Sequence, residues 1–362
     1  MRGAWSVCAA MAMACGPGGS DVRDVSGLLE VVARKADGLA RPQDLAFDPW
    51  EDDLLWVVNR RDRTVTFVEE ASSDAPRTST VEDPYAVHFM ERVSSIAFGA
   101  PRTFGTCQDG RNTYGGAVPG DGFMGPALWS ADRDIFATSN PEAVEYLTNL
   151  HGMPTDLGSH LDMLHESPFC VGIAWEADNV YWVFDGSDGA VVRYDFQTDH
   201  GVGYDDHSDG IIARYAPGSL SRVSGTVGHV VFDQVTRRVL VADSGNGRIA
   251  VLDADAGARG AALGSKEPGV DHHLMADVQV DTLVDGQAVG LERPAGLWLV
   301  DDHLVATDAA TGHVFVFDAE GGLVAELDTG LGPDALAGVT GRSLEDLWLV
   351  DVAGNRVLRL RW

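Results

Sequence analysis

Three histidines carry the clearest chemical signal in the chain. His88 lies seven residues before Ser95, and His165 lies seven residues before Gly172. Ser95 and Gly172 each begin a short apolar run, and a third histidine, His229, begins a run of the same kind. Neutral imidazole is a good ligand for zinc, copper and iron. We therefore expect His88, His165 and His229 to converge on one transition-metal ion.

Two of the nearby residues are candidates for acting on a substrate. A metal held at His229 would act as a Lewis acid and would lower the pKa of a bound water. Arg92 lies between His88 and Ser95, where its guanidinium group could hold an anionic part of the substrate. The alternatives are a hydrogen-bonded channel-wall histidine for His229 and a solvated loop arginine for Arg92.

Two loops contain a further group of metal-ligand residue types. The first loop contributes His160, Asp162 and Glu166. The second loop alternates acids, histidines and glycines, and its candidate ligands are Asp199, His200, Asp205, Asp206, His207 and Asp209. Glycine lets backbone carbonyls turn inward, so this second loop suits a cation such as calcium. Its spacing is not that of the helix–loop–helix calcium motif, and an acidic loop rich in turns is the alternative.

A repeated frame must position these side chains. Five copies consist of an apolar run, a polar turn and a second apolar run, and the first run ends at Asn59, Asp185, Asp243, Asp308 or Asp351. Two apolar runs around a tight turn predict a β-hairpin. One more apolar run precedes each hairpin, and with a sixth copy these runs begin at Asp44, Ser95, Gly172, His229, Gly296 and Gly338. The sixth copy, which starts at Ser95, is interrupted after Asp109.

Six copies of this frame predict an all-β fold, a six-bladed β-propeller with four-stranded blades. The chain stops at the third strand of the last copy, and residues 27–32 resemble the outer strand at residues 322–327. We expect residues 27–32 to complete the last blade, which would leave no open sheet edge there. The six residues that begin the innermost strands should then line the central channel.

The first residues of the chain resemble a secretory signal. A single arginine precedes a short apolar run, and Ala12-Met-Ala-Cys15 before a glycine-rich stretch resembles a bacterial lipobox. Ala12 stands where the lipobox usually has leucine, so lipidation at Cys15 and a signal peptide without lipidation are both left open, and contact with a membrane is expected only through such an anchor. The expected organisation is a signal peptide at 1–15, a tether at 16–26 and one propeller at 27–362, with insertions at 110–167, 197–213 and 256–290.

Composition and cysteine usage bound the partners and the compartment. The formal net charge of −29 argues against nucleic acid, whose phosphates need a basic surface. Beyond the leader only Cys107 and Cys170 remain, and they fall at the ends of strands in neighbouring copies. We expect them to form a disulfide in an oxidising compartment, the periplasm or cell surface, with two buried thiols as the alternative. We expect a monomer that binds a small molecule or a peptide.

The repeat over residues 27–362 resembles the NHL-repeat and related six-bladed propellers. The histidines are similar to those of the peptidyl-hydroxyglycine amidating lyase, a six-bladed propeller with a histidine-ligated zinc at its channel. That enzyme draws its ligands from equivalent channel positions in several blades, whereas only His229 occupies such a position here. The resemblance implies a metal-dependent lyase or hydrolase that acts on a small molecule or peptide end. The alternative is a non-catalytic propeller that binds a ligand or a protein.

Overall fold

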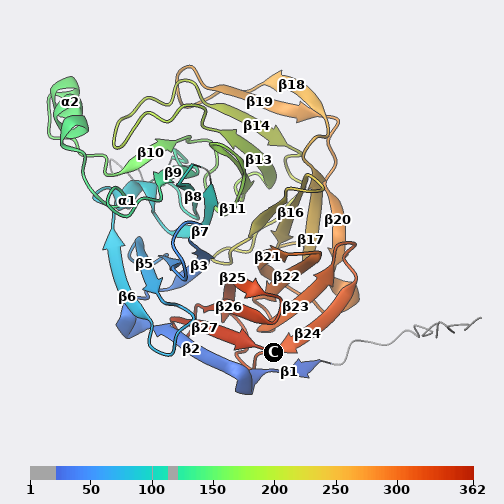
Figure 1. Cartoon of the computed structure of the whole chain (residues 1–362). Coiled ribbons are helices and arrows are strands. Elements are labelled where there is room, and N and C mark those ends of the chain that lie inside the picture. Colours follow the sequence, from blue (N-terminus) through green and yellow to red (C-terminus); the bar gives the residue numbers. More distant parts are fainter. Residues whose placement is uncertain (1–21, 100, 113–120) are drawn as a thin grey trace, which may run out of the picture.

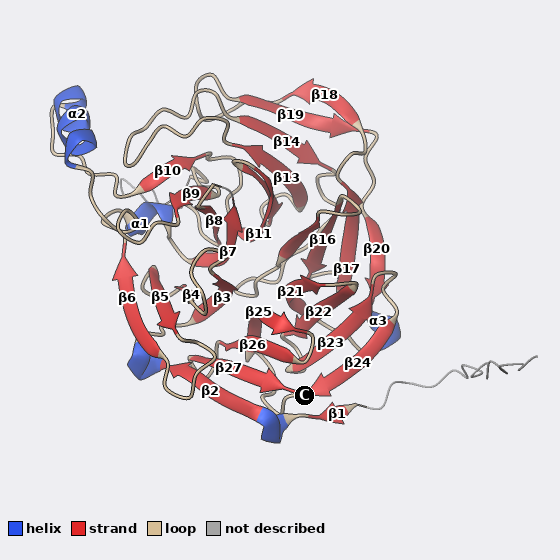
Figure 2. Ribbon diagram, in the orientation of Figure 1, coloured by secondary structure: helices blue, strands red, loops and turns tan. Residues whose placement is uncertain are grey.

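The fold is a ring of six β-sheets around a central channel (Figure 1). The computed structural model describes residues 22–99, 101–112 and 121–362. The expected signal peptide, Cys15 and most of the expected tether lie outside these residues. Strands dominate the described chain, with three α-helices at the periphery (Figure 2). These helices are α1 (Ala86–Phe89), α2 (Pro141–His151) and α3 (Gly286–Val289). The six-bladed propeller predicted from the repeat is confirmed.

Three blades contain four strands each, in chain order from the channel outward. Blade one contains β3 (Pro42–Phe47), β4 (Leu55–Asn59), β5 (Thr64–Glu69) and β6 (Arg77–Glu82). Blade two contains β7 (Val93–Gly99), β8 (Thr103–Gln108), β9 (Ala127–Ser130) and β10 (His160–Met163). Blade four contains β15 (Val230–Asp233), β16 (Arg238–Asp243), β17 (Arg248–Asp253) and β20 (Asp281–Asp285). Blade two therefore takes its two outer strands from the stretch 110–167, and α2 projects beside them (Figure 1).

Blade three is wider than the repeat predicts. It contains β11 (Cys170–Ala177), β12 (Val180–Asp185), β13 (Ala190–Asp195) and β14 (Ile211–Tyr215), and then β19 (Asp271–Ala276) and β18 (Ala258–Ala262). β19 lies parallel to β14, with Ile211 opposite Asp271. The chain therefore leaves blade four after β17, extends blade three, and returns to form β20. This excursion places the loop between β18 and β19 near the loops of blades two and three.

The N-terminal part of the described chain closes the ring. Blade six contains β25 (Leu336–Ser343), β26 (Asp346–Asp351), β27 (Arg356–Arg361) and β2 (Leu29–Arg34). β2 pairs antiparallel with β27, with Leu29 opposite Leu360. This confirms that the N-terminal strand completes the last blade, two residues later in the chain than the pattern predicted. Blade five contains β21 (Pro294–Val300), β22 (His303–Asp308), β23 (His313–Asp318) and β24 (Leu323–Asp328), and β1 (Arg23–Asp24) adds to it in parallel.

The acid that ends the second strand of a blade is a structural group. Asp308 accepts hydrogen bonds from the backbone N–H groups of Glu292 and Arg293 at 2.8 and 3.0 Å. Asp243 accepts one from the backbone N–H of Ser221 at 2.8 Å and one from Arg248 Nε at 2.8 Å. Both carboxylates are fully buried. Each carboxylate therefore ties its hairpin to a neighbouring loop, because buried backbone donors need partners.

The predicted disulfide is present. Cys107 on β8 and Cys170 at the start of β11 are bonded, with their Cα atoms 5.1 Å apart. Both residues are fully buried in the apolar layer between blades two and three. The bond links neighbouring blades close to the loops that carry the histidines.

Candidate functional site

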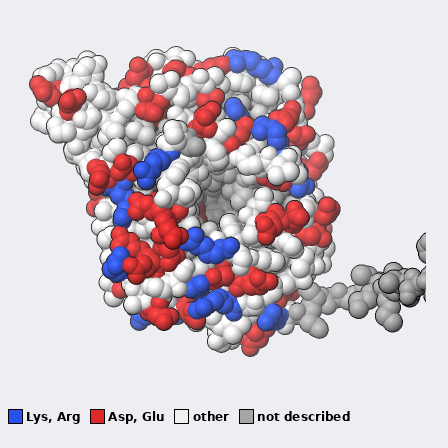
Figure 3. Space-filling view, in the orientation of Figure 1, with Lys and Arg blue, Asp and Glu red and all other residues white. Residues whose placement is uncertain are grey.

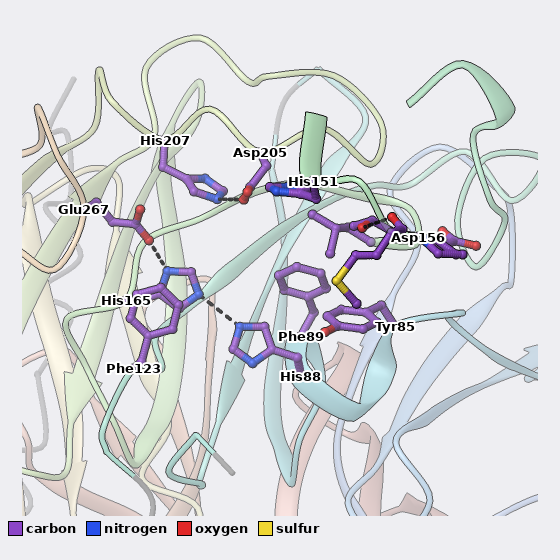
Figure 4. Close-up of a pocket in the computed structure, with 14 residues that line it drawn as sticks. Tyr85, His88, Phe89, Phe123, His151, Asp156, His165, Asp205, His207 and Glu267 are labelled. Atoms are coloured by element: carbon purple, nitrogen blue, oxygen red, sulfur yellow. Dashed lines mark hydrogen bonds and ion pairs between the residues drawn. The ribbon is translucent and has the colours of Figure 1, made fainter. Parts of the chain in front are cut away.

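A cavity of about 620 Å³ opens among the loops of blades two and three (Figure 4). Its polar wall includes His88, His165, Asp205, His207 and Glu267, and aromatic or apolar residues such as Tyr85, Phe89, Phe123 and Leu157 line it beside them. These five polar residues come from four separate segments of the chain. A pocket of mostly apolar lining with a few convergent polar groups is typical of a small-molecule site.

His88 and His165 meet in this cavity. Their Nε2 atoms are 3.1 Å apart, and His165 Nδ1 contacts Glu267 (Figure 4). The ring of Phe123 stacks on His165 with centroids 3.7 Å apart. Burial lowers the pKa of both imidazoles, and for His88 it falls to about 4, with the nearby His165 adding to the effect. Both rings are therefore neutral at physiological pH, the form that can bind a metal.

Three further histidines form a tighter group next to this pair. His160, His200 and His207 each offer a ring nitrogen, and these three atoms lie within 4.8 Å of one another. His160 is the first residue of β10, whereas His200 and His207 come from the loop between β13 and β14. His165 lies beside the group, with its ring centroid 5.8 Å from that of His207. We call His160, His200 and His207 the histidine triad.

In the triad, each Nδ1 atom faces an oxygen acceptor. His160 Nδ1 donates to the backbone carbonyl of Leu157 at 2.9 Å, and His200 Nδ1 donates to that of Gly201 at 2.7 Å. His207 Nδ1 lies 2.9 Å from Asp162 Oδ1. A metal-bound histidine usually donates its second ring N–H to a carboxylate or a backbone carbonyl, which fixes the tautomer. His160 and His200 therefore present Nε2 as the free ligand atom, whereas both ring nitrogens of His207 contact carboxylates.

The Nε2 atoms of the triad are short of protein partners. Those of His160 and His200 are buried and have no hydrogen-bond partner among the described residues. A buried polar atom without a partner is costly, and in a native structure it calls for an explanation such as an ion or a water. His207 Nε2 lies 3.1 Å from Asp205 Oδ1, a contact that a metal ion at this nitrogen would replace. The three ligand atoms are imidazole nitrogens, which are common ligands of zinc, copper and iron.

Charge is distributed unevenly within the triad. Burial and the nearby imidazoles lower the pKa of His160, and for His200 the same effects lower it to about 4. Burial also opposes the charge on His207, but hydrogen bonds to Asp162 and Asp205 outweigh it and raise the pKa to about 10. Burial raises the pKa of Asp162 to about 6. At neutral pH the site therefore holds two neutral imidazoles and one imidazolium between carboxylates.

The other acids of the second loop serve as turn caps. Asp199 accepts from the backbone N–H of Gly201 at 3.1 Å, Asp206 from that of Ser208 at 3.2 Å, and Asp209 from that of Thr198 at 3.2 Å. The loop thus brings its histidines together and uses these three carboxylates locally. Calcium prefers oxygen ligands, whereas the ligand atoms that this loop and His160 bring together are imidazole nitrogens.

Glu166 positions the loop that carries Glu267. Its carboxylate accepts from Ser265 Oγ at 3.0 Å, from the backbone N–H of Lys266 at 2.5 Å, and pairs with Lys266 Nζ at 3.1 Å. These bonds fasten the loop between β18 and β19 beside His165. The sequence pattern did not single out Glu267, because nothing in the repeat indicates that residues 258–276 join blade three.

His229 and Arg92 lie in other cavities. His229 Nε2 lies 3.2 Å from Asp44 Oδ1, which reaches it across the channel from the facing blade one. That pair lines a channel cavity whose wall includes neither His88 nor His165. The expected convergence of three histidines is therefore corrected: the described structure joins His88 to His165 and assigns His229 to the channel wall. Figure 3 shows a hollow at the middle of one face, among scattered acidic side chains. Arg92 lines a separate cavity.

Comparison with known proteins supports the fold alone. No family model matches the chain, and no curated protein is similar to it in sequence. Solved structures similar to it include a protein of unknown function from Bacteroides thetaiotaomicron, with a TM-score of 0.55, 10% identity, and coverage of 92% of this chain and 75% of that one. An auxiliary nutrient binding protein from the same species has a TM-score of 0.54 and 12% identity, and the match covers 89% of this chain and 69% of that one. A luciferin-regenerating enzyme has a TM-score of 0.51 and 12% identity, and the match covers 92% of this chain and 95% of that one. These neighbours are six-bladed propellers.

The described residues contain no helix long and apolar enough to span a membrane.

Proposed function

We propose that this protein is an extracytoplasmic metal-dependent hydrolase or lyase whose metal is held by the histidine triad. The observation that carries the proposal is that every Nδ1 of the triad lies against an oxygen acceptor, while the Nε2 atoms of His160 and His200 have no partner within the described part of the chain. Three protein nitrogens with a position left for water or substrate are typical of catalytic zinc sites.

The residues around the triad have separate tasks. A bound metal would supply Lewis acidity and a nucleophilic water at neutral pH. Glu267, whose pKa is raised by burial, would accept a proton from such a water, since a base with a raised pKa works best near neutrality. Asp162 orients His207, and Glu166 holds the Glu267 loop in place. His88 and His165 line the wall on which a substrate would rest.

The cavity indicates the kind of substrate. Tyr85, Phe89 and Phe123 line it beside the polar groups, so a small molecule or peptide end with an apolar or aromatic part fits it. The resemblance to the amidating lyase makes a peptidyl-hydroxyglycine the first substrate to try. A second candidate function is non-catalytic ligand binding, which the similarity to the auxiliary nutrient binding protein supports.

An extracytoplasmic location is supported by the Cys107–Cys170 bond, because structural disulfides persist in oxidising compartments. The signal-like leader and the lipobox-like Cys15 point the same way. Cell fractionation of the source organism would test the location, and mass spectrometry of the N-terminus would test lipidation.

Metal analysis tests the proposal directly. Protein purified without a histidine tag should carry about one transition-metal ion per chain, or take one up from zinc, and His200→Ala should abolish this. His303→Ala, at the start of β22 in blade five, is the matched control and should leave metal content unchanged. Activity that needs the metal supports the enzyme, whereas metal-independent ligand binding supports the second candidate. Absence of metal binding in the wild-type protein would end the metal proposal.

A further inference from the structure

A second cavity, distinct from the histidine pocket, is lined by four arginines. It measures about 650 Å³, and Arg41, Arg60, Arg61 and Arg92 form much of its wall. Among the described residues, none lines both this cavity and the histidine pocket. The chain has 55 acidic residues and only 26 lysines and arginines. A cavity lined by four described guanidinium groups and one described carboxylate is therefore much more basic than the protein as a whole.

The backbone fixes these arginines around the end of the channel where the innermost strands begin. Arg41 directly precedes β3, and Arg92 directly precedes β7. The backbone N–H of Arg60 donates to the carbonyl of Arg41 at 3.1 Å, and that of Arg41 donates to Asn355 Oδ1 at 2.6 Å. Blades one, two and six therefore all contribute to one rim.

The nearby carboxylates are already engaged. Asp109 is buried and pairs with Arg60 at 2.7 Å and with Arg222 at 2.9 Å. Asp334, the only acid among the described residues that line the cavity, pairs with Arg293 at 2.5 Å. The guanidinium groups of Arg41, Arg61 and Arg92 form no ion pair or hydrogen bond with any residue in 22–99, 101–112 and 121–362.

Arg60 is the most buried of the four arginines and is affected by its neighbours. Burial lowers the pKa of Arg60, and the charges of Arg41 and Arg92 lower it further, while Asp109 opposes both effects. The positive charges around the cavity outnumber the carboxylates that pair with them, and a bound anion would offset this excess. Planar guanidinium groups suit carboxylate and phosphate oxygens, to which they can donate two parallel hydrogen bonds.

We infer that this cavity, which we call the arginine cavity, binds a small anion that carries at least two negative charges on carboxylate or phosphate groups. The size of the cavity suits a metabolite-sized ligand. The net charge of −29 disfavours an extended polyanion, which would have to lie along the acidic surface beyond the rim. The inference does not depend on the metal site, because the two cavities have different walls.

Isothermal titration of the full-length protein at low ionic strength tests the inference, with inorganic phosphate, succinate and acetate as probes. We expect phosphate, succinate or both to bind more tightly than monovalent acetate, and binding to weaken as salt is added. Binding of only one of the two dianions would assign the ligand to the phosphate or the carboxylate class.

Variants locate the binding. Arg61→Gln and Arg92→Gln should each weaken the affinity roughly tenfold, because each removes charge-assisted hydrogen bonds. Both side chains are exposed, so the variants should fold, which thermal unfolding would check. Arg361→Gln, in an exposed ion pair with Glu30 on the rim of blade six, is the matched control and should bind as the wild type does.

The His200→Ala variant separates the two sites and should bind the dianion normally. Loss of dianion binding in His200→Ala would place the anion on the metal site and would overturn the inference. It would also be overturned if neither dianion bound the wild type, or if Arg61→Gln and Arg92→Gln bound it with unchanged affinity.

Discussion

Replacing Asp162 should weaken metal binding at the histidine triad in two graded steps. The Asp162 carboxylate is buried, 1% exposed, and its Oδ1 lies 2.9 Å from His207 Nδ1. Asp162→Asn keeps an oxygen acceptor but removes the charge, whereas Asp162→Ala removes both. Mutating the group that hydrogen-bonds to a metal-bound histidine typically weakens metal affinity 10- to 100-fold. We therefore expect about tenfold weaker binding for Asp162→Asn and about a hundredfold for Asp162→Ala, or about 1.4 and 2.7 kcal/mol.

The assay is zinc binding in competition with a chromogenic chelator at one fixed pH. Asp206→Asn is the matched control, because Asp206 belongs to the same loop and only caps a turn at Ser208. Thermal unfolding of the metal-free variants would show whether the fold survives the loss of a buried carboxylate. The reasoning is refuted if folded Asp162→Ala binds zinc as tightly as the wild type or no more weakly than Asp206→Asn.

Three further predictions concern protons, the disulfide and ring closure. Metal binding should release about one proton at neutral pH, because the pKa of His207 is raised to about 10, whereas the pKa values of His160 and His200 are lowered. The apparent metal affinity should therefore rise about tenfold per pH unit between about pH 6 and 9. An affinity that does not change with pH would contradict this. Cys170→Ser should lower the free energy of unfolding by up to about 4 kcal/mol in denaturant titration, from the 63-residue loop that the bond closes. Deletion of residues 22–34 should promote association, seen as increased light scattering, because it exposes the edge of β27.

The repeat made the fold predictable from the sequence. Alternation of apolar runs and turns depends on local chemistry, and each blade repeats it, so one interrupted copy could still be recognised. Closure by the N-terminal strand also followed, because an unpaired outer edge in the last blade needed a partner. The extension of blade three by β18 and β19 could not be predicted from the repeat. The parallel pairing of β14 with β19 joins segments about 60 residues apart, and the repeat does not encode it.

The site was only partly predictable for a related reason. Equal spacing before the innermost strands brought His88 and His165 to neighbouring loops, where they meet. His229 directly precedes the innermost strand β15, and its ring lies in the channel 3.2 Å from Asp44. The triad depends on loop paths in two different blades, which residue spacing does not encode. Residue types alone did mark His160, His200 and His207 as donors, but not which of them would converge.

The pairing of β2 with β27 also determines how the ring resists mechanical force. Leu29 pairs with Leu360 at one end of this ladder, and Arg34 pairs with Arg356 at the other. A force that pulls the two ends of the chain apart therefore loads the Leu29–Leu360 end first and opens the ladder one pair at a time, like a zipper. Before this ladder bears load, the force must detach β1, whose Arg23 and Asp24 lie parallel to β24. It must also detach the fully buried Val25, whose N–H donates to the backbone carbonyl of Asp328 at 2.9 Å. Residues 23–25 must therefore detach before the force can open the last blade.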